Sequence, residues 1–280
     1  MPAFSRTTGS NMPAAIQRCP ATIGLKIWSQ TGVGIRTNHG LGIRIEKMSS
    51  VARLISSSSL QTRSQYSQNS SHDLGTGRML IPLLQAGLQV EGFDVSPHML
   101  AICRGHCAER GLDPVLSEAD MTTFTSPGRY AAVILPAGSF GLVAGREAAL
   151  RALGCFRESL RPGGRLIVDV DAPGRMTGPV QAPVRHWRRH PFLWTLQTMT
   201  VEHDQAAHQS TWFARYEKWQ DGGLIATELQ LLRLQHWSLT EFTGLLTEAG
   251  FTSIEVIAGY RDGRPPGPDD LTWTFTARRA

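Results

Sequence analysis

The sequence predicts an α/β fold organised around a mainly parallel β-sheet. Strand and helix patterns alternate between residues 79 and 170, and the strand patterns are apolar along most of their length, as in sheets buried on both faces. A glycine-containing turn, "DLGTGR" at residues 73–78, precedes the first of these helices. Alternation at this spacing implies right-handed crossovers that place helices on the faces of the sheet.

Each predicted helix carries a recognisable end signal. The helix at residues 79–87 ends at Gly87, which suits the left-handed backbone of a C-cap. The next helix, at residues 96–111, begins with Ser96 as its N-cap. The third, at residues 145–164, ends in a Pro-Gly-Gly stop. The accompanying strands are expected at residues 88–95, 130–136 and 165–170.

Residues 172–237 differ in composition and pattern from the preceding segment, and we expect them to form a cap. Five tryptophans lie in this segment: Trp187, Trp194, Trp212, Trp219 and Trp237. The stretches 211–219 and 224–237 alternate as strands do, on either side of the hairpin signal Asp-Gly-Gly at residues 221–223. We therefore expect a β-meander inserted after the strand at residues 165–170.

The last part of the chain is expected to complete the fold. A helix at residues 238–250 starts with a capping box formed by Ser238 and Glu241. The stretches 253–260 and 271–278 then form an antiparallel closing pair.

Charge and composition divide the chain in two. Residues 1–72 contain eight Lys or Arg and one acid, Glu46, so they carry +7; the whole chain carries +5, which leaves about −2 on residues 73–280. The first segment is rich in Ser and Gln and has no sustained apolar period. We therefore expect residues 1–71 to be disordered or wrongly assigned and residues 72–280 to form the folded domain, with the cap at about 172–237. An organellar transit peptide and a misassigned start or reading frame both remain open for the first segment.

These totals also limit the partners. The slightly negative folded part argues against nucleic acid as a partner, because such binding requires a basic face on the domain. The basic stretch "RHWRRH" at residues 185–190 has two open interpretations, a solvated loop and a contact for an anionic acceptor or RNA. No apolar run reaches the roughly 18–20 residues of a membrane span, so no membrane contact is expected.

Cysteine usage favours a reducing compartment. Four scattered cysteines are too few for a disulfide framework in a chain of 280 residues. We expect a cytoplasmic protein, or an organellar one if residues 1–71 act as a transit peptide. Cys103, His106 and Cys107 share a helix, but no second cluster completes four ligands, so no metal site is expected.

The glycine turn indicates a nucleotide-type ligand. Glycines between a first strand and a first helix let the backbone approach a ligand closely, and an acid about 20 residues downstream can accept ribose hydroxyls. Asp94 lies 21 residues after Asp73 and ends a predicted strand. A dinucleotide fingerprint would need a third glycine at position 80, which is Leu80, and the loop lacks the Lys-Ser/Thr pair of a triphosphate loop. An oxidoreductase is therefore disfavoured.

The stretch "DLGTGRMLIPLLQAGLQVEGFDVSPHML" resembles the cofactor region of class I S-adenosylmethionine-dependent methyltransferases. Further on, "EADMTTF", "YAAVILPAGSFGLV" and "LRPGGRLIVDV" resemble later motifs of that family in the same order and spacing. The resemblance covers residues 73–171 and, more loosely, the meander and terminal helix of the family's small-molecule branch. It implies a Rossmann-like class I methyltransferase sheet, with the meander cap after the fifth strand. It also implies methyl transfer from S-adenosylmethionine to a small-molecule acceptor.

The resemblance further implies roles for individual residues. Asp73, Gly75 and Gly77 would lie against the methionine end of the cofactor, and Asp94 would bind its ribose. Around the adenine, Val95 and Met99 would pack, Asp120 would accept from the amino group, and the Met121 backbone would meet a ring nitrogen. Pro136, at the cofactor, would line the site of methyl transfer together with Ala137 and Phe140 of the acceptor pocket. Solvated strand ends are the alternative for Asp94 and Asp120, and core packing is the alternative for Met99 and Phe140.

Two departures from the family pattern keep a second function open. The glycine motif lacks two residues between Leu74 and Thr76, and the preceding stretch 64–72 is polar where a central strand should be apolar. A catalytically inactive binding protein on the same fold is therefore the alternative to an enzyme. The catalytic residue, the acceptor and the oligomeric state are not predicted. Four histidines in or near the cap are candidate bases: His186, His190, His203 and His236.

Overall fold

The computed structural model describes residues 77–172, 184–258, 264–267, 270 and 272–280. The predictions for residues 1–71, for the polar stretch 64–72, and for Asp73 and Gly75 lie outside these residues. The described elements are, in order, α2 (Leu80–Gln85), β1 (Glu91–Asp94), α3 (Pro97–Ala108), β2 (Val115–Glu118), β3 (Tyr130–Leu135), η3 (Ser139–Leu142), α4 (Arg146–Ser159), β4 (Leu160–Asp171), β5 (Arg185–Arg189), β6 (Phe192–Asp204), β7 (Gln209–Gln220), β8 (Gly223–Gln235), α5 (Leu239–Glu248), β9 (Phe251–Ala258) and β10 (Thr272–Arg279).

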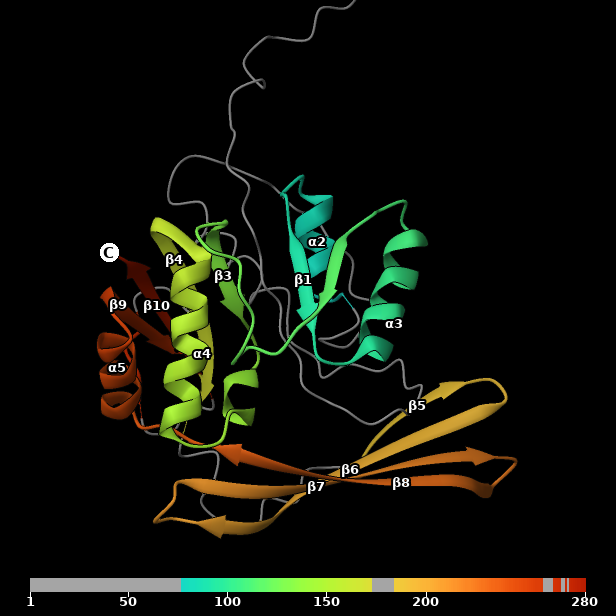
Figure 1. Ribbon diagram of the computed structural model, residues 1–280. Coiled ribbons are helices and arrows are strands. Elements are labelled where there is room, and N and C mark those ends of the chain that lie inside the picture. Colours follow the sequence, from blue (N-terminus) through green and yellow to red (C-terminus); the bar gives the residue numbers. More distant parts are fainter. Residues whose placement is uncertain (1–76, 173–183, 259–263, 268–269, 271) are drawn as a thin grey trace, which may run out of the picture.

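The main sheet has two described parts, as Figure 1 shows. In the first part β1 pairs with β2 in parallel. In the second, β3 pairs with β4 in parallel, and β10 and β9 continue the sheet in antiparallel order. The α/β class and the antiparallel closing pair predicted from the sequence are therefore confirmed.

Alternation along β3 and β4 explains why helices cover both faces of this sheet. Val133 and Leu135 pack in a large core cluster with side chains of α4 and α5, whereas Ile134 packs in a second cluster with side chains of α2 and α3. On β4, Ile167 likewise joins the second cluster and its two neighbours in sequence join the first. Neighbouring strand residues point to opposite faces, so a strand apolar throughout is buried on both sides.

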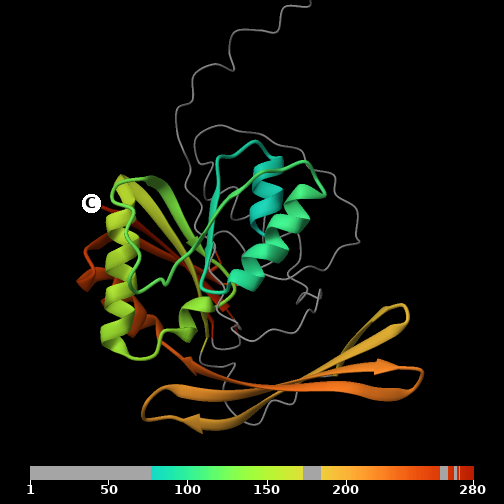
Figure 2. The same cartoon turned by 45° about the vertical axis from the view of Figure 1, so that its right-hand side comes forward.

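The predicted meander is a separate antiparallel sheet in the order β5-β6-β7-β8. Its β7–β8 turn has left-handed backbone at Asp221 (φ +50°) and Gly222 (φ +81°), as the Asp-Gly-Gly signal predicted. Figures 1 and 2 show this sheet lying across the end of the molecule toward which the carboxyl ends of β1, β3 and β4 point. The meander is therefore placed at the edge where ligands of α/β folds bind.

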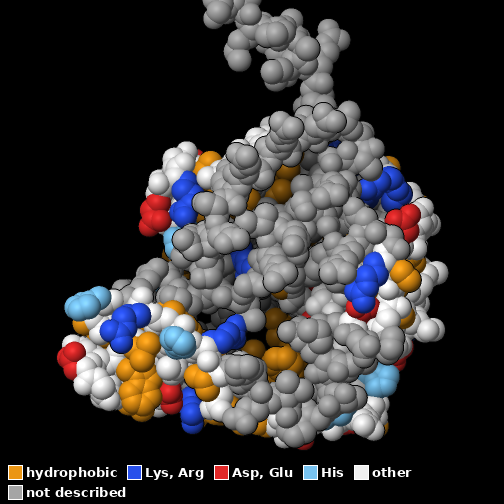
Figure 3. Space-filling view, turned by 180° about the vertical axis from the view of Figure 1, so that it is seen from behind, with side chains coloured by type: hydrophobic (Ala, Val, Ile, Leu, Met, Phe, Trp, Pro, Cys, Tyr) orange, Lys and Arg blue, Asp and Glu red, His pale blue; other side chains and the backbone are white. Residues whose placement is uncertain are grey.

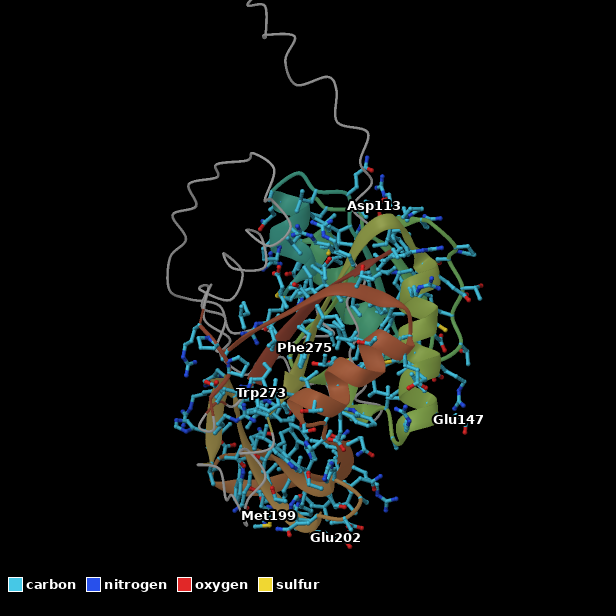
Figure 4. The ribbon with its side chains drawn as sticks, turned by 90° about the vertical axis from the view of Figure 1, so that its left-hand side faces the viewer. Asp113, Glu147, Met199, Glu202, Trp273 and Phe275 are labelled. Carbon is cyan, nitrogen blue, oxygen red and sulfur yellow. The ribbon has the colours of Figure 1, made fainter. Side chains whose placement is uncertain are left out.

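The meander sheet has two distinct faces. A Cβ atom on Gly141 would lie 3.9 Å from Leu234 Cδ2, so the face that carries Leu234 is turned toward the main domain. The opposite face carries Leu229 (59% exposed) and Leu231 (67% exposed). In Figure 4 Met199 lies on that outer face, turned away from the rest of the chain. We call these the inner and outer faces.

One local expectation was wrong, one strand was not anticipated, and one of two open interpretations is excluded. The Pro-Gly-Gly stretch does not stand between helix and strand: α4 ends at Ser159, and β4 already begins at Leu160, with a register shift against β3 between Tyr130 and Ala132. The strand β2 was not anticipated, because its exposed edge gives it no apolar pattern. The "RHWRRH" stretch is not a loop but strand β5, paired with β6. From behind, the visible part of the meander mixes hydrophobic, basic and histidine side chains (Figure 3).

Candidate functional site

The described end of the glycine turn has a backbone that only glycine adopts readily. Gly77 has a φ of +96°, and a Cβ there would lie 2.9 Å from Ile81 Cδ1 and 3.0 Å from Cys103 Sγ. Its carbonyl accepts a hydrogen bond from the Ile81 N–H at 2.7 Å, which starts the turn into α2. The glycine at this position is thus required by conformation and by space.

Asp94 ends β1 and is 2% exposed. Its Oδ1 accepts the Ser96 backbone N–H at 2.8 Å, and the Ser96 hydroxyl in turn caps α3 by accepting the Met99 N–H at 3.3 Å. Val95 and Met99 are partly exposed next to this carboxylate. The carboxylate is therefore held by the strand end and the helix start together, so it is not a solvated strand end.

Asp120 follows β2 at the same edge. The Ala119 N–H donates to the Asp94 carbonyl at 3.2 Å, which keeps the ends of β1 and β2 together. Asp120 Oδ1 accepts both the N–H and the hydroxyl of Thr122, at 2.7 and 2.6 Å. Met121 is fully buried in the core. The structure thus places Asp94 and Asp120 at the ends of paired strands, and their roles at the ribose and adenine stay predictions.

The loop after β3 reaches the same edge. Pro136 is buried, and Ala137 has a φ of +60°, unusual for a residue with a Cβ. The Ala137 N–H donates to Asp169 Oδ2 at 2.8 Å. Phe140 is fully buried and packs edge-on against Phe242 with ring centroids 5.1 Å apart, so the structure gives it core packing. Its predicted place in an acceptor pocket stays a prediction.

Sequence reasoning missed the two acids under this loop. Asp169 and Asp171 end β4 after its apolar run Leu166–Val168, and a Cβ on Gly138 would lie 2.9 Å from the Asp171 carboxyl. The detectable signal was the spacing of these acids by two residues, because such a spacing puts both side chains on one face of a strand.

His236, one of the four candidate bases, is buried and contacts Ser210. It is 3% exposed, and its Nε2 lies 2.8 Å from the Ser210 hydroxyl, which also accepts the Trp212 indole N–H at 3.0 Å. Burial, followed by the charges of His203 and His208, lowers the pKa of His236 to about 4. The ring is therefore neutral near pH 7.

The cysteine pair on α3 is buried. Burial is the main cause that raises the pKa of Cys103 to about 12, so its thiol stays protonated at neutral pH.

Within the described ranges no group of three or more His, Cys, Asp and Glu side chains is placed to hold a metal ion. No helix in those ranges is long and apolar enough to span a bilayer.

Comparisons with known proteins relate the chain to methyltransferases. Residues 74–164 match the family model of a methyltransferase domain. A protein named "Putative methyltransferase", from Geobacillus sp. (strain WCH70), is 24% identical over 207 residues, which cover 73% of this chain and 81% of that protein.

Two solved structures show the same fold. An S-adenosylmethionine-dependent methyltransferase from Clostridium acetobutylicum aligns with a TM-score of 0.61 at 12% identity, over 73% of this chain and 80% of that one. The sugar N-methyltransferase KedS8 from Streptoalloteichus sp. aligns with a TM-score of 0.60 at 22% identity, over 74% and 77%. Residues 74–164 therefore match a methyltransferase domain, and the chain has the fold of the class I S-adenosylmethionine-dependent methyltransferases.

Proposed function

We propose that this protein transfers a methyl group from S-adenosylmethionine to a small-molecule acceptor. The observation that carries the proposal is the shared edge: the buried Asp94 at the end of β1, Asp120 after β2 and the left-handed Ala137 after β3 all stand at carboxyl ends of strands, and the meander sheet lies across those ends. Ligands of open α/β sheets bind outside the carboxyl ends of the strands.

The residues at this edge suit the ribose, the adenine and the methionine end of such a cofactor. We assign Asp94 to the ribose hydroxyls, because it is a carboxylate fixed at a strand end, and Asp120 with the Met121 backbone to the adenine edge. Val95 and Met99 supply apolar surface for the ring. Gly77, with Asp73 and Gly75 of the same turn, is assigned to the methionine end, and Pro136 borders the site. When bound, the cofactor supplies a methyl group on a positively charged sulfur.

The acceptor is assigned to the part of the inner face beside Trp212, next to the end of β8 that lies against the loop at residues 136–141. Gln235 accepts the Gly145 N–H at 3.3 Å, and a Cβ on Gly141 would lie 3.2 Å from the Gln235 carbonyl, so this end of β8 lies against the loop. Trp212 and Leu232 are paired on the same face of the meander. A flat indole beside an apolar side chain suits a ring-shaped acceptor.

The chain's contribution to the reaction is orientation and exclusion of water. The donor is already activated, so aligning acceptor and methyl group can contribute roughly 7–11 kcal/mol. A base is required only if the acceptor atom must lose a proton. We assign no catalytic residue, because His236 is engaged with Ser210 in the interior.

The first test is titration calorimetry of the full chain with S-adenosylmethionine. Asp94→Ala should abolish the binding heat, since it removes the carboxylate assigned to the ribose. Asp113→Ala is the matched control: Asp113 is exposed and lies at the opposite end of the molecule from the meander (Figure 4). No binding by a folded wild-type chain would reject the enzyme in favour of an inactive methyltransferase-fold protein.

An acceptor screen follows if the cofactor binds. Sugars that carry an amine are the first candidates, since KedS8, which shares the fold, is a sugar N-methyltransferase. Methyl transfer to amino sugars but not to the corresponding neutral sugars would assign nitrogen as the acceptor atom. Transfer only to the neutral sugars would assign oxygen.

A further inference from the structure

A buried carboxylate on β4 lies directly beneath the loop that follows β3. Asp169 is 4% exposed. Its Oδ2 accepts the backbone N–H of Ala137 at 2.8 Å, and its Oδ1 accepts the Thr274 hydroxyl from β10 at 2.7 Å. One side chain therefore connects the loop to two strands in the middle of the main sheet.

The loop has a backbone that its own sequence does not favour. Ala137 and Gly138 have φ values of +60° and +72°, two left-handed residues in succession, as in a type I′ turn. The Ser139 N–H and hydroxyl both donate to the Pro136 carbonyl, at 3.5 and 3.1 Å, and close this turn. Alanine at the first left-handed position is sterically unfavourable, so the conformation needs support from outside the loop.

The surrounding strands leave the loop little room. A Cβ on Gly138 would lie 2.9 Å from the Asp171 carboxyl, and one on Gly141 would lie 3.2 Å from the Gln235 carbonyl. The loop is thus confined between the end of β4 and the end of β8. Of these contacts, the Ala137–Asp169 hydrogen bond is the one that reaches the strained residue itself.

We infer that Asp169 is a positioning residue that holds the loop at residues 136–141 in place through the Ala137 N–H. The inference rests on the proposed function, which puts methyl transfer at this loop. Asp169 acts through Ala137 rather than by touching cofactor or acceptor. A shift of the loop moves the acceptor relative to the methyl group, to which displacement reactions are sensitive.

Three variants separate this role from general packing. Asp169→Asn keeps the size of the side chain but loses the charge and one acceptor oxygen. Thr274→Val is the matched control: it removes a different hydrogen bond of the same carboxylate and leaves the Ala137 bond in place. Ala137→Gly in the Asp169→Asn background is the rescue, because glycine adopts a φ of +60° without a Cβ penalty.

The measurements are amide hydrogen exchange at Ala137, the Kd for S-adenosylmethionine, and kcat and KM for the acceptor. Asp169→Asn should speed exchange of the Ala137 amide about tenfold, since the hydrogen bond to this amide loses its charge assistance. It should lower kcat/KM for the acceptor about tenfold or more while the cofactor Kd changes by less than about threefold. Thr274→Val should leave Ala137 exchange within about twofold of wild type. The double variant with Ala137→Gly should have a kcat/KM at least about threefold higher than that of Asp169→Asn, because the strain at position 137 is removed.

The inference is overturned if Ala137 exchange is unchanged in Asp169→Asn, if Thr274→Val speeds it equally, or if the glycine gives no rescue. If Asp169→Asn loses its near-ultraviolet circular dichroism, the double variant is compared with Ala137→Gly alone, and faster exchange of the glycine amide at position 137 is expected in the double variant. If the wild-type chain transfers no methyl group, the proposed function fails, and the exchange data still decide whether Asp169 holds the loop.

Discussion

At the scale of single residues, Gly77 offers the sharpest test of the glycine turn. Gly77→Ala should destabilise the protein by about 3 kcal/mol, since it adds left-handed strain and a clash with two buried side chains. Those side chains are Ile81 and Cys103, 8% and 3% exposed. The measurement is the free energy of unfolding in urea.

A second glycine supplies the control for this prediction. Gly87 also has a positive φ, +80°, but no atom lies within 4 Å of a Cβ built there. Gly87→Ala should therefore cost about 1 kcal/mol, the conformational part alone. Equal decreases in the free energy of unfolding for the two variants would show that the clash at Gly77 does not destabilise the protein.

His236 makes stability depend on pH. Its pKa in the folded protein, about 4, lies below the ordinary value of 6.5, so the unfolded chain binds the proton more readily. The stabilisation is complete above pH 6.5 and is lost as the pH falls toward 4. Between pH 7 and pH 5 we expect a loss of about 2 kcal/mol in the free energy of unfolding.

Urea denaturation of His236→Gln at the same two pH values checks this expectation. The variant should lose most of the pH dependence, because glutamine can still meet the Ser210 hydroxyl but does not titrate. His190→Gln, at an exposed position, should retain it. A pH dependence that survives in His236→Gln would assign the effect to another group.

At the scale of elements, the two faces of the meander sheet should differ in function. Trp212 and Trp219 are both partly buried and each donates its indole N–H to a hydroxyl of the same sheet, but they lie on opposite faces. Trp212→Ala should raise the KM for the acceptor about fivefold, because an aromatic contact is worth about 1 kcal/mol. Trp219→Ala, on the outer face, should leave the KM within about twofold. Steady-state kinetics at saturating S-adenosylmethionine distinguish the two, and a larger effect at Trp219 would reverse the assignment of the faces.

The elements show which parts of the fold could be predicted from the sequence. Helix starts with local signals were predicted correctly: the Ser238 hydroxyl accepts the Glu241 N–H at 3.2 Å, and the Glu241 carboxylate accepts the Ser238 N–H at 2.8 Å. The start of β4 was missed, because proline and glycine signal a turn locally and only pairing with β3 makes Leu160 part of a strand.

The candidate site was predictable in part for the same reason. The place of Asp94 at a strand end could be predicted, because it depends on a local pattern, whereas its role at the ribose stays a prediction. The role of Asp169 could not, since its partners Ala137 and Thr274 lie 32 and 105 residues away in sequence. Contacts over such separations follow from strand order, which sequence patterns leave open.

At the scale of the whole molecule, the two described parts of the main sheet are joined by a buried acid. Glu91 on β1 is 9% exposed, and its carboxylate pairs with the Arg129 guanidinium and accepts the Tyr130 hydroxyl at 2.8 Å. Burial first, and the hydrogen bond to Glu91 second, raise the pKa of Tyr130 to about 12, so its hydroxyl donates at all ordinary pH values. The three residues thus connect β1 to the start of β3.

Removing this charge should destabilise the whole domain rather than one helix or strand. Glu91→Gln should cost about 2 kcal/mol, because it breaks a partly buried ion pair and offers the buried tyrosine a weaker acceptor. Glu147→Gln is the matched control: Glu147 points outward (Figure 4), and its pair with Arg151, one helical turn away at 2.7 Å, is exposed. That control should change stability by less than about 0.5 kcal/mol. Urea unfolding followed by both tryptophan fluorescence and far-ultraviolet circular dichroism tests the idea. If the two probes give coincident transitions and only Glu91→Gln shifts them, Glu91 stabilises both parts of the sheet together. Equal shifts for the two variants would show that Glu91 contributes no more than an exposed charge.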